Sequence, residues 1–399
     1  MNMVSRRRKV GVAVVGMGGA VATTAAAGLE VLRLGSNRMD GLPLAHMSIP
    51  RMVQYEDLAL QGWDLNPQSL ADAALEHAVL TTDQMQKVQP SLAASQPWPG
   101  VASAAFCKRI EGANMHRADG HRAAVDAIVQ DLHRFRDVGG YDGLVVINLA
   151  STERTPAASE AWATPEAFER GLDNDDHAIG PAMLYAYAAI SAGVPYGNFT
   201  PSTAAEVPAL VEIARRRGVP IAGKDGKTGQ TLIKTVLAPA FKARALHVDG
   251  WFSTNILGNR DGEALQDPDS LKSKLGTKGN VLDSILGYPV EDHLVDIRYY
   301  RPRGDDKEAW DNIDITGFLG QRMQMKVNFL CKDSVLAAPL VLEIARVLDL
   351  AHQRGDAGPQ EQLSLFFKAP MTAAGQAPEH SFPVQERMLH DWLIGGAGA

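Results

Sequence analysis

A strand-like run near the N-terminus, followed at once by closely spaced glycines, is the feature that most constrains the fold. Residues 9–15 have the sequence KVGVAVV, Gly16-Met17-Gly18-Gly19 comes next, and the alanine-rich segment after it favours a helix. Small residues at such a turn let the backbone approach a pyrophosphate, and the following helix N-terminus attracts negative charge. The pattern predicts the first half of a dinucleotide-binding turn, although Val21 occupies the third glycine position of the usual motif. A tight structural turn without a ligand is the alternative.

The acidic residue that would bind the ribose hydroxyls of a dinucleotide is expected roughly 20 residues beyond the glycines. The candidate that we favour is Asp64, in Gly62-Trp63-Asp64, which lies much further along the chain. This assignment requires an insertion between the first and second strands. Residues 35–50, rich in Gly, Pro and Asn, are typical of a loop.

Helical and strand-like segments alternate over the N-terminal half. Residues 123–135 carry apolar side chains at helical spacing, and residues 143–149 (GLVVINL) form a continuous apolar run typical of a strand buried on both faces. Residues 179–192 favour another helix, and residues 220–223 another short strand. Such alternation predicts a parallel α/β sheet.

The pattern changes beyond residue 228. A helix is expected over 230–244 and strands with partial alternation follow, so this part is predicted to be mixed α+β. Residues 334–352 are apolar nearly all round and predict a buried helix, whereas the tail from residue 372 is expected to be loosely ordered. The expected strands cover residues 247–254, 294–301, 313–318 and 323–330.

Charge and cysteine content argue against several classes of partner. With 46 acidic against 39 basic residues the net charge is −7, so the chain has no overall basic field for a nucleic acid or an anionic membrane. The chain contains no run of about 18 uncharged apolar residues rich in Leu, Ile and Phe, which argues against a membrane-spanning helix. The two cysteines, Cys107 and Cys331, are too few for a disulfide framework or a cysteine zinc site and fit a reducing compartment. We expect neither a nucleic acid nor a membrane as partner.

The N-terminus also has features of a twin-arginine signal, since residues 5–9 (SRRRK) precede a small, apolar segment. Cleavage after the alanines of that segment would remove the predicted strand and glycine turn. A functional turn therefore requires that the segment be retained, and we expect a cytoplasmic protein.

A second polar, glycine-bearing loop, residues 223–231 (GKDGKTGQT), leads into a predicted helix. Successive backbone N–H groups, the hydroxyls of Thr228 and Thr231 and the helix dipole would together bind an anion. The loop does not match the P-loop pattern. A solvated loop with a helix cap is the alternative.

Four lysines lie in unusual surroundings for surface residues. Lys368 follows the hydrophobic run 363–367, where a fully exposed ammonium fits poorly. If Lys274 and Lys278 lie on one helical turn, they share a face, and their repulsion would lower the pKa of one of them toward neutrality. A lysine so tuned could move protons. The fourth is Lys307, which follows Gly304-Asp305-Asp306.

Other polar clusters have simple structural interpretations. Residues 255–262 (NILGNRDG) favour a turn by composition alone. Asp333-Ser334, before the predicted buried helix, is equally well explained as an N-cap. His177, beside Asp175 and Asp176, has no second histidine at ligand spacing, so we interpret it as part of a surface loop rather than a metal site.

Many short motifs occur in one order along the chain, and together they resemble the inositol-3-phosphate synthase family, also called myo-inositol-1-phosphate synthase. The resemblance covers most of the chain from residue 9 to about 371. Collinear agreement of many motifs is far more specific than any one of them. The matching stretches are residues 16–19, 62–64, 151–154, 181–186, 198–201, 225–231, 255–262, 273–283, 304–307, 331–339 and 363–370.

The resemblance implies a fold, a cofactor and a reaction. The fold is α/β, with a Rossmann-type NAD-binding domain (residues 1–227 plus 338–399) and an inserted α+β domain (228–337) for catalysis and tetramer assembly. The reaction converts D-glucose 6-phosphate into 1D-myo-inositol 3-phosphate with bound NAD that is reduced and then reoxidised, in a homotetramer. A sugar-phosphate oxidoreductase or epimerase without cyclisation, and a catalytically silent NAD-binding regulator, are the alternatives. A divalent or monovalent cation is left open.

The resemblance also assigns site residues by matching positions. Lys274, Lys278, Lys307 and Lys368 resemble the catalytic lysines. The cofactor positions are Gly16, Gly18, Gly19, Ala20, Val21, Asp64, Thr152, Asp225, Asp333 and Ser334. The substrate positions are Thr228, Gly229, Gln230, Thr231, Asn255, Leu257, Asn259 and Asp261.

Three departures from the family pattern bear on ligand binding. Residues 20–22 (AVA) stand where the family usually has two asparagines and a glycine, which affects the pyrophosphate contacts. Lys224 stands where the family often has aspartate, and Arg260 where it often has asparagine. Both of these add positive charge near the expected phosphate, so they could tighten anion binding or indicate a different substrate.

Overall fold

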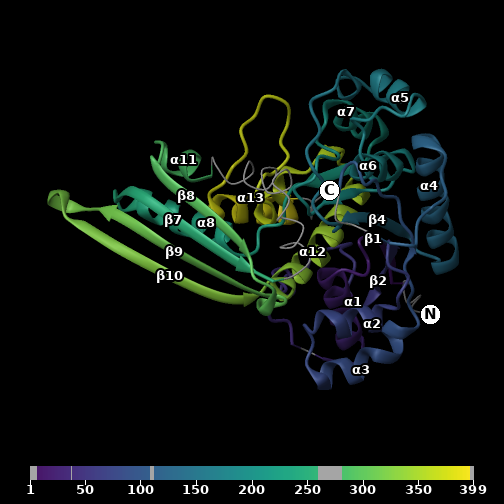
Figure 1. Ribbon diagram of the computed structural model, residues 1–399, viewed down its shortest axis with the longest axis horizontal. Helices are drawn as coiled ribbons and strands as arrows, with labels where there is room; N and C mark the ends of the chain where they lie inside the picture. Colours follow the sequence, from purple (N-terminus) through teal and green to yellow (C-terminus); the bar gives the residue numbers. More distant parts are fainter. Residues whose placement is uncertain (1–6, 37, 108–111, 259–280, 396–399) are drawn as a thin grey trace.

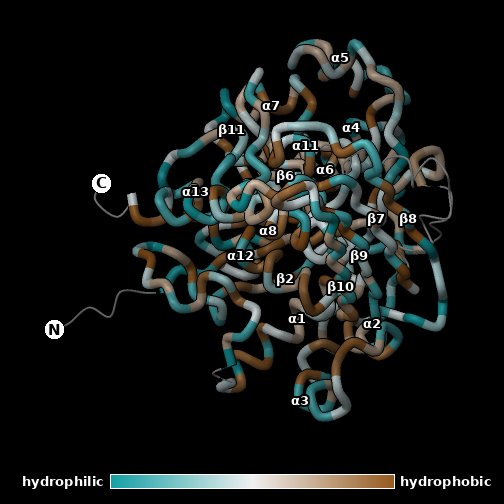
Figure 2. Tube along the Cα trace, turned by 90° about the vertical axis from the view of Figure 1, so that its left-hand side faces the viewer, coloured by the Kyte–Doolittle hydropathy of each residue, from teal (hydrophilic) through white to brown (hydrophobic). Residues whose placement is uncertain are grey.

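Two β-sheets organise the molecule, which is described here by a computed structural model covering residues 7–36, 38–107, 112–258 and 281–395. One sheet has seven strands and helices on both faces, and the other has four strands and extends away from it (Figure 1). Hydrophobic residues gather along the central strands and the helices packed on them (Figure 2). Within the described residues, no helix is both long and apolar enough to cross a membrane.

The larger sheet is parallel throughout and its strand order reverses beside β1. β1 pairs with both β2 and β4, so the chain builds outward from β1 in two directions. In such a doubly wound sheet, ligands bind at the carboxyl ends of the strands where the order reverses. In spatial order the strands are β11 (Gly358–Pro359), β6 (Pro220–Gly223), β5 (Tyr196–Asn198), β4 (Gly143–Asn148), β1 (Val10–Val15), β2 (Leu58–Asp64) and β3 (Trp98–Pro99).

Both faces of this sheet are buried, which explains the continuous apolar runs of β1 and β4. In β1, Val12 and Val14 belong to the core cluster on one face, whereas Ala13 and Val15 belong to the cluster on the other. The first face is covered by α1 (Ala20–Arg33), α2 (Leu70–His77), α3 (Thr82–Ala93) and α12 (Asp333–Arg354). The second is covered by α4 (Gly120–Gly139), α5 (Pro165–Asp173), α6 (Pro181–Ser191) and α7 (Pro208–Arg217). The predicted parallel α/β sheet is confirmed.

The insertion that the Asp64 assignment required is present between the end of α1 and the start of β2. A buried carboxylate on α12, Glu343, holds it in place. This carboxylate accepts hydrogen bonds from the Tyr55 hydroxyl (2.5 Å), the Leu44 backbone N–H (3.0 Å) and the Arg346 guanidinium (2.7 Å). The inserted loop therefore packs against α12 through a fully buried polar network.

The smaller sheet has the order β10-β9-β7-β8, with β7 and β8 parallel and the other pairs antiparallel. One face packs on two helices through a core that includes Trp251 and Ile313. On the other face, Phe252 and Leu294 lie directly opposite each other and are exposed. The elements are α8 (Gln230–Ala243), β7 (His247–Leu257), α11 (Val281–Leu286), β8 (Asp292–Tyr299), β9 (Asp306–Thr316) and β10 (Arg322–Lys332).

The expectation of a loosely ordered tail is wrong for half of its length, because residues Phe382–Gly395 form helix α13. Leu389 and Leu393, four residues apart, are completely buried in the core cluster that includes α12. A pair at this spacing lies on one helix face and signals a packed helix. The glycine-rich end of the chain obscured this signal.

Candidate functional site

The glycine turn after β1 is held by backbone and side-chain contacts to the end of β2. The N–H groups of Gly16 and Met17 donate to the Trp63 carbonyl oxygen at 2.8 and 2.9 Å. The Gly18 N–H donates to Asp64 Oδ2 at 2.8 Å. A Cβ at Gly18 would lie 3.1 Å from the same oxygen, so the close approach depends on glycine. The structure thus brings Asp64 to the turn despite the long sequence separation.

The start of α1 presents free backbone donors beside this turn. Gly19 is the N-cap, and no side chain caps the helix. In the part of the chain that the structure describes, the N–H groups of Ala20, Val21 and Ala22 donate to no protein acceptor. Free N–H groups at a helix start form an anion-binding site. This geometry fits the pyrophosphate of a dinucleotide, and the Asp64 carboxylate lies beside it.

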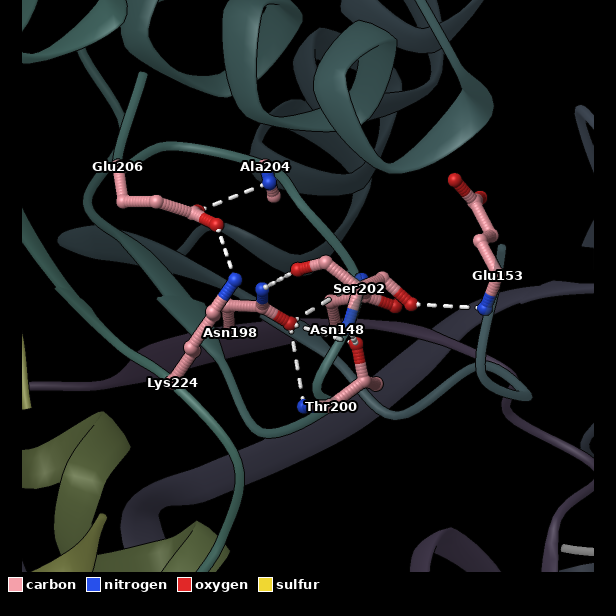
Figure 3. A network of polar contacts seen from close by, with 8 residues as sticks. All are labelled: Asn148, Glu153, Asn198, Thr200, Ser202, Ala204, Glu206 and Lys224. Atoms are coloured by element: carbon pink, nitrogen blue, oxygen red, sulfur yellow. Dashed lines mark hydrogen bonds and ion pairs between the residues drawn. The ribbon is translucent and has the colours of Figure 1, made fainter. Parts of the chain in front are cut away.

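A buried polar network lies at the carboxyl ends of β4 and β5 (Figure 3). Asn148 ends β4 and Asn198 ends β5, and their carboxamides are 3.4 Å apart. The Asn198 amide donates to the Ser202 carbonyl oxygen at 2.7 Å, and the Ser202 hydroxyl accepts from the Glu153 N–H at 3.0 Å. The network orders the segment that carries Thr152, which is buried.

Glu153 is a titratable residue at this edge that the sequence analysis did not assign. Burial raises the pKa of its carboxyl group to about 8, while a hydrogen bond from the Ala182 N–H lowers it in part. Ala182 lies in the first turn of α6. An acidic residue shortly after a strand predicted to be fully buried was the signal in the sequence.

The predicted anion-binding loop is buried rather than solvated. Its backbone passes between two other segments: Asp225 N–H donates to the Thr200 carbonyl oxygen (3.0 Å), and Lys227 N–H donates to the Phe366 carbonyl oxygen (2.8 Å). The interpretation as a solvated loop is therefore wrong. Asp225, Lys227, Thr228, Gln230 and Thr231 are all at most 6% exposed.

Lys368 forms a buried ion pair with this loop. Its Nζ lies 2.7 Å from Asp225 Oδ1, and the two side chains are 8% and 5% exposed. Its backbone N–H donates to the Asp225 carbonyl oxygen at 2.7 Å, so main chain and side chain contact the same residue. The expectation that Lys368 is not an exposed surface lysine is confirmed.

Lys307 reaches the same loop from the smaller sheet. Asp333 Oδ1 lies 3.3 Å from Lys307 Nζ and accepts a hydrogen bond from the Thr228 hydroxyl at 3.0 Å. A Cβ at Gly229 would lie 3.5 Å from Lys307 Nζ, so this ammonium faces the loop backbone. Residues predicted separately for substrate and cofactor are therefore in direct contact.

The N-cap interpretation of Asp333-Ser334 is wrong. Lys332 is the N-cap of α12, and Asp305 supplies the capping contacts, accepting from the Ser334 hydroxyl at 2.6 Å and from its N–H at 3.3 Å. Burial raises the pKa of Asp305. Asp305 therefore takes over the capping role and leaves Asp333 to contact the loop.

The end of β7 presents an unsatisfied acceptor. Asn255 donates through Nδ2 to Gln230 Oε1, and Gln230 Nε2 lies 3.4 Å from the Thr254 carbonyl oxygen. Asn255 Oδ1 is buried and has no hydrogen-bond partner among the residues that the structure describes. A buried acceptor of this kind is expected to bind a ligand donor. Leu257, also predicted for the substrate, is buried at the end of the same strand.

Four predicted site residues, Lys274, Lys278, Asn259 and Asp261, lie outside the described residues, as does Arg260.

Two other polar residues take structural positions. Lys224 pairs with Glu206 at 2.6 Å (Figure 3), so its extra charge is neutralised by a carboxylate. The His177 side chain is fully exposed, as expected of a surface loop. Among the described residues, no group of three or more His, Cys, Asp or Glu could hold a metal ion.

Two buried lysines were missed. Lys227 donates to Gln385 Oε1 on α13, and burial lowers its pKa to about 7. Lys234 Nζ lies 2.7 Å from His293 Nε2, and burial lowers its pKa to about 8. Lys234 is one helical turn beyond Gln230, and this spacing was the signal that it faces the sheet.

Comparison with known proteins identifies the family. A family model described as myo-inositol-1-phosphate synthase matches residues 31–393. Inositol-3-phosphate synthase 1 of Bacteroides thetaiotaomicron is 40% identical over 407 residues, which cover 96% of this chain and 95% of the relative. Isozyme 2 of the same enzyme from Arabidopsis thaliana is 31% identical over 384 residues, covering 91% of this chain and 75% of the relative.

Solved structures agree with the fold. Inositol-3-phosphate synthase from Caenorhabditis elegans superposes with a TM-score of 0.90 at 23% identity, covering 98% of this chain and 86% of the other. A myo-inositol-1-phosphate synthase-related protein from Thermotoga maritima gives a TM-score of 0.81 at 24% identity, covering 97% and 99%. These structures establish a shared fold, and the sequence matches over nearly the full length go further: the chain belongs to the myo-inositol-1-phosphate synthase family.

Proposed function

We propose that the chain is an NAD-dependent isomerase that converts D-glucose 6-phosphate to 1D-myo-inositol 3-phosphate. The observation that carries this proposal is the convergence of Lys368, Lys307 and their carboxylate partners on one buried loop that precedes α8. Positive charge and helix N-terminal N–H groups together suit a phosphate ester. The names of the relatives support the same reaction.

The residues at the glycine turn fit NAD. The start of α1 would bind its pyrophosphate through the free N–H donors, and the Asp64 carboxylate would bind ribose hydroxyls. When bound, NAD supplies the hydride acceptor for C5 of the open-chain sugar phosphate and later returns the hydride. The network around Thr152 and Asn198 lies at the carboxyl ends of neighbouring strands and would order the adjoining part of the cofactor site.

The lysines would stabilise charge that develops on the substrate. A C5 ketone acidifies the C6 hydrogens, the resulting enolate attacks the C1 aldehyde, and negative charge appears on oxygen at each step. Lys307 and Lys368 are assigned to the C5 and C1 oxyanions, where one preorganised donor is commonly worth about 3 kcal/mol. Lys274 is assigned to relay the C5 hydroxyl proton and Lys278 to help hold the phosphate. Asp225 would hold the Lys368 ammonium in position through their ion pair.

The reaction can be tested by incubating purified protein with NAD and glucose 6-phosphate and identifying the product by phosphorus NMR. We expect a non-reducing inositol phosphate without net NADH. Accumulation of NADH with an oxidised sugar phosphate would instead favour an oxidoreductase, and no consumption of substrate would favour a silent regulator. Lys368→Ala, Lys307→Ala and Lys274→Ala should each abolish turnover while NAD binding persists. Near-normal activity in any of them would refute its assigned role.

We also propose a homotetramer in which the uncovered face of the smaller sheet contributes an interface. On this face, Phe252, Leu294 and Leu330 are exposed, and Trp310 packs edge-on against Phe252 with ring centroids 5.7 Å apart. Exposed apolar side chains on one sheet face favour association. Light scattering coupled to size exclusion should give four chains per particle, and Phe252→Asp should reduce that number.

We propose a cytoplasmic location. β1 is a central strand of the parallel sheet, and the alanine-rich segment after it is part of α1. Removal of both by signal cleavage would delete the centre of the fold. Recovery of the intact N-terminus by mass spectrometry of protein from the cell would agree with this location, and recovery of a form cleaved within α1 would contradict it.

A further inference from the structure

His77, the last residue of α2, reaches the glycine turn from outside the β1 and α1 unit. Its Nε2 lies 2.8 Å from the carbonyl oxygen of Gly18. A carbonyl oxygen can only accept a hydrogen bond, so this nitrogen must carry the hydrogen. His77 therefore donates to the second glycine of the turn.

With this contact, both backbone hydrogen-bonding groups of Gly18 are anchored. The Gly18 N–H is bonded to Asp64 and its carbonyl oxygen to His77. The Gly19 N–H donates to the Gly16 carbonyl oxygen at 3.1 Å. Of these partners, only His77 comes from α2, so it alone ties the turn to a third element.

The anchored turn leaves a small set of donors for an anion. These are the N–H groups of Ala20, Val21 and Ala22, whose side chains carry no polar atom. Affinity for a pyrophosphate at this helix start must therefore come from backbone dipoles, and it depends on how well the turn is held in the binding geometry. A Gly18 carbonyl oxygen turned toward the pyrophosphate would repel it, and the bond to His77 fixes that oxygen toward α2.

The position of His77 is itself well defined. The helix is capped at its start by Ser69, whose hydroxyl accepts from the Asp72 N–H at 3.2 Å. Leu70 and Ala74 are buried in the same core cluster as Ala22 of α1. Helix α2 thus packs on α1, and His77 contacts the glycine turn that leads into α1. The imidazole is therefore carried by a packed helix rather than by a loop.

We propose that His77 is a positioning residue for the dinucleotide: by holding the Gly18 carbonyl it preorganises the turn, and it contributes to NAD affinity without taking part in the chemistry. The inference rests on the proposed NAD site. Loss of one hydrogen bond of this kind corresponds to a change of about three- to tenfold in the dissociation constant.

The test is an equilibrium titration of NAD⁺ into the ligand-free protein by calorimetry, for the wild type, His77→Ala, His77→Gln and His133→Ala. His133 is an exposed histidine on α4 and serves as the matched control. We expect His77→Ala to weaken NAD⁺ binding about three- to tenfold. His77→Gln, whose amide retains an N–H donor, should recover part of the loss, and His133→Ala should bind as the wild type does. In the activity assay, the NAD⁺ concentration that gives the half-maximal rate should rise by a similar factor in His77→Ala and stay unchanged in His133→Ala.

Two results would overturn the proposal. An unchanged NAD⁺ dissociation constant in a folded His77→Ala variant would show that the contact does not matter. A lower melting temperature of the ligand-free variant, with equal losses of NAD⁺ and substrate affinity, would show a purely structural role. If the wild type binds NAD⁺ but makes no inositol phosphate, the proposed reaction fails while the NAD⁺ titration still decides the role of His77.

Discussion

Replacement of Lys368 by methionine should separate the contribution of the buried ion pair to stability from its contribution to catalysis. Methionine keeps most of the aliphatic volume of lysine but removes the ammonium. The Asp225 carboxylate, 5% exposed, then loses the cation that lies 2.7 Å away. Removing one partner of a buried ion pair is strongly unfavourable, so we expect Lys368→Met to be both inactive and unstable.

The magnitude can be worked from the burial of both side chains. Removing one partner of a buried pair costs about 3–5 kcal/mol. Unfolding entropy near 60 °C is about 2.1 cal/mol/K per residue, which for 399 residues is about 0.8 kcal/mol/K. The melting temperature should therefore fall by about 4–6 °C. Differential scanning fluorimetry of the ligand-free protein measures this directly.

The double variant Lys368→Met/Asp225→Asn is the control, because it removes both charges and keeps the shapes. Neutral replacement of a buried pair is often nearly neutral for stability, so its melting temperature should return to within about 2 °C of the wild type. Turnover should stay absent, because the ammonium is still missing. If the double variant is as unstable as the single one, or the single one loses less than about 1 °C, the ion pair does not stabilise the loop as argued.

Three further perturbations test other parts of the structure. Burial raises the pKa of Glu153 from 4.5 to about 8. The protonated carboxyl group therefore contributes stability that is present below the unfolded pKa and is lost as the pH rises through the folded pKa. Glu153→Gln should lessen the resulting fall in melting temperature between about pH 5 and 9. Glu343→Ala leaves the Arg346 guanidinium buried without its carboxylate and should cost about 3–5 kcal/mol in urea unfolding, so a loss below about 1 kcal/mol would contradict the buried-network argument. Gly226→Ala would place a Cβ 2.1 Å from the Phe199 ring, so it should displace the loop and raise the KM for the sugar phosphate at least several-fold, and an unchanged KM would contradict the packing.

The fold could be predicted from the sequence where both faces of a strand, or nearly all sides of a helix, are buried. β1 and β4 are covered on both faces, and their continuous apolar runs follow from this. Helix α12 was predicted from a segment that is apolar nearly all round, and it is buried over most of its length. Boundaries were less predictable: β9 begins at Asp306, seven residues before the expected strand 313–318, because most residues in its first half are polar.

The glycine turn and the unusual setting of Lys368 could be recognised from local sequence, but their partners could not. Lys368 and Asp225 are separated by 143 residues, and Gly18 and His77 by 59. No local pattern encodes such pairs, because chain topology alone brings the segments together. The N-cap interpretation of Asp333 failed for the same reason, since Asp305, in the turn before β9, takes that role.

Two buried lysines of the loop region, Lys368 and Lys227, have partners of different charge. Lys368 faces a carboxylate, which favours its charged form, whereas the described partner of Lys227 is a neutral amide, and burial lowers the pKa of Lys227 to about 7. A neutral amine still has N–H donors, so the bond to Gln385 survives loss of the proton. The anchoring of the loop by α13 is therefore insensitive to pH near neutrality. The positive charge of Lys227, the residue directly before Thr228, does depend on pH and falls as the pH rises through about 7. Phosphate binding at this loop should therefore weaken over the same range while the fold stays intact.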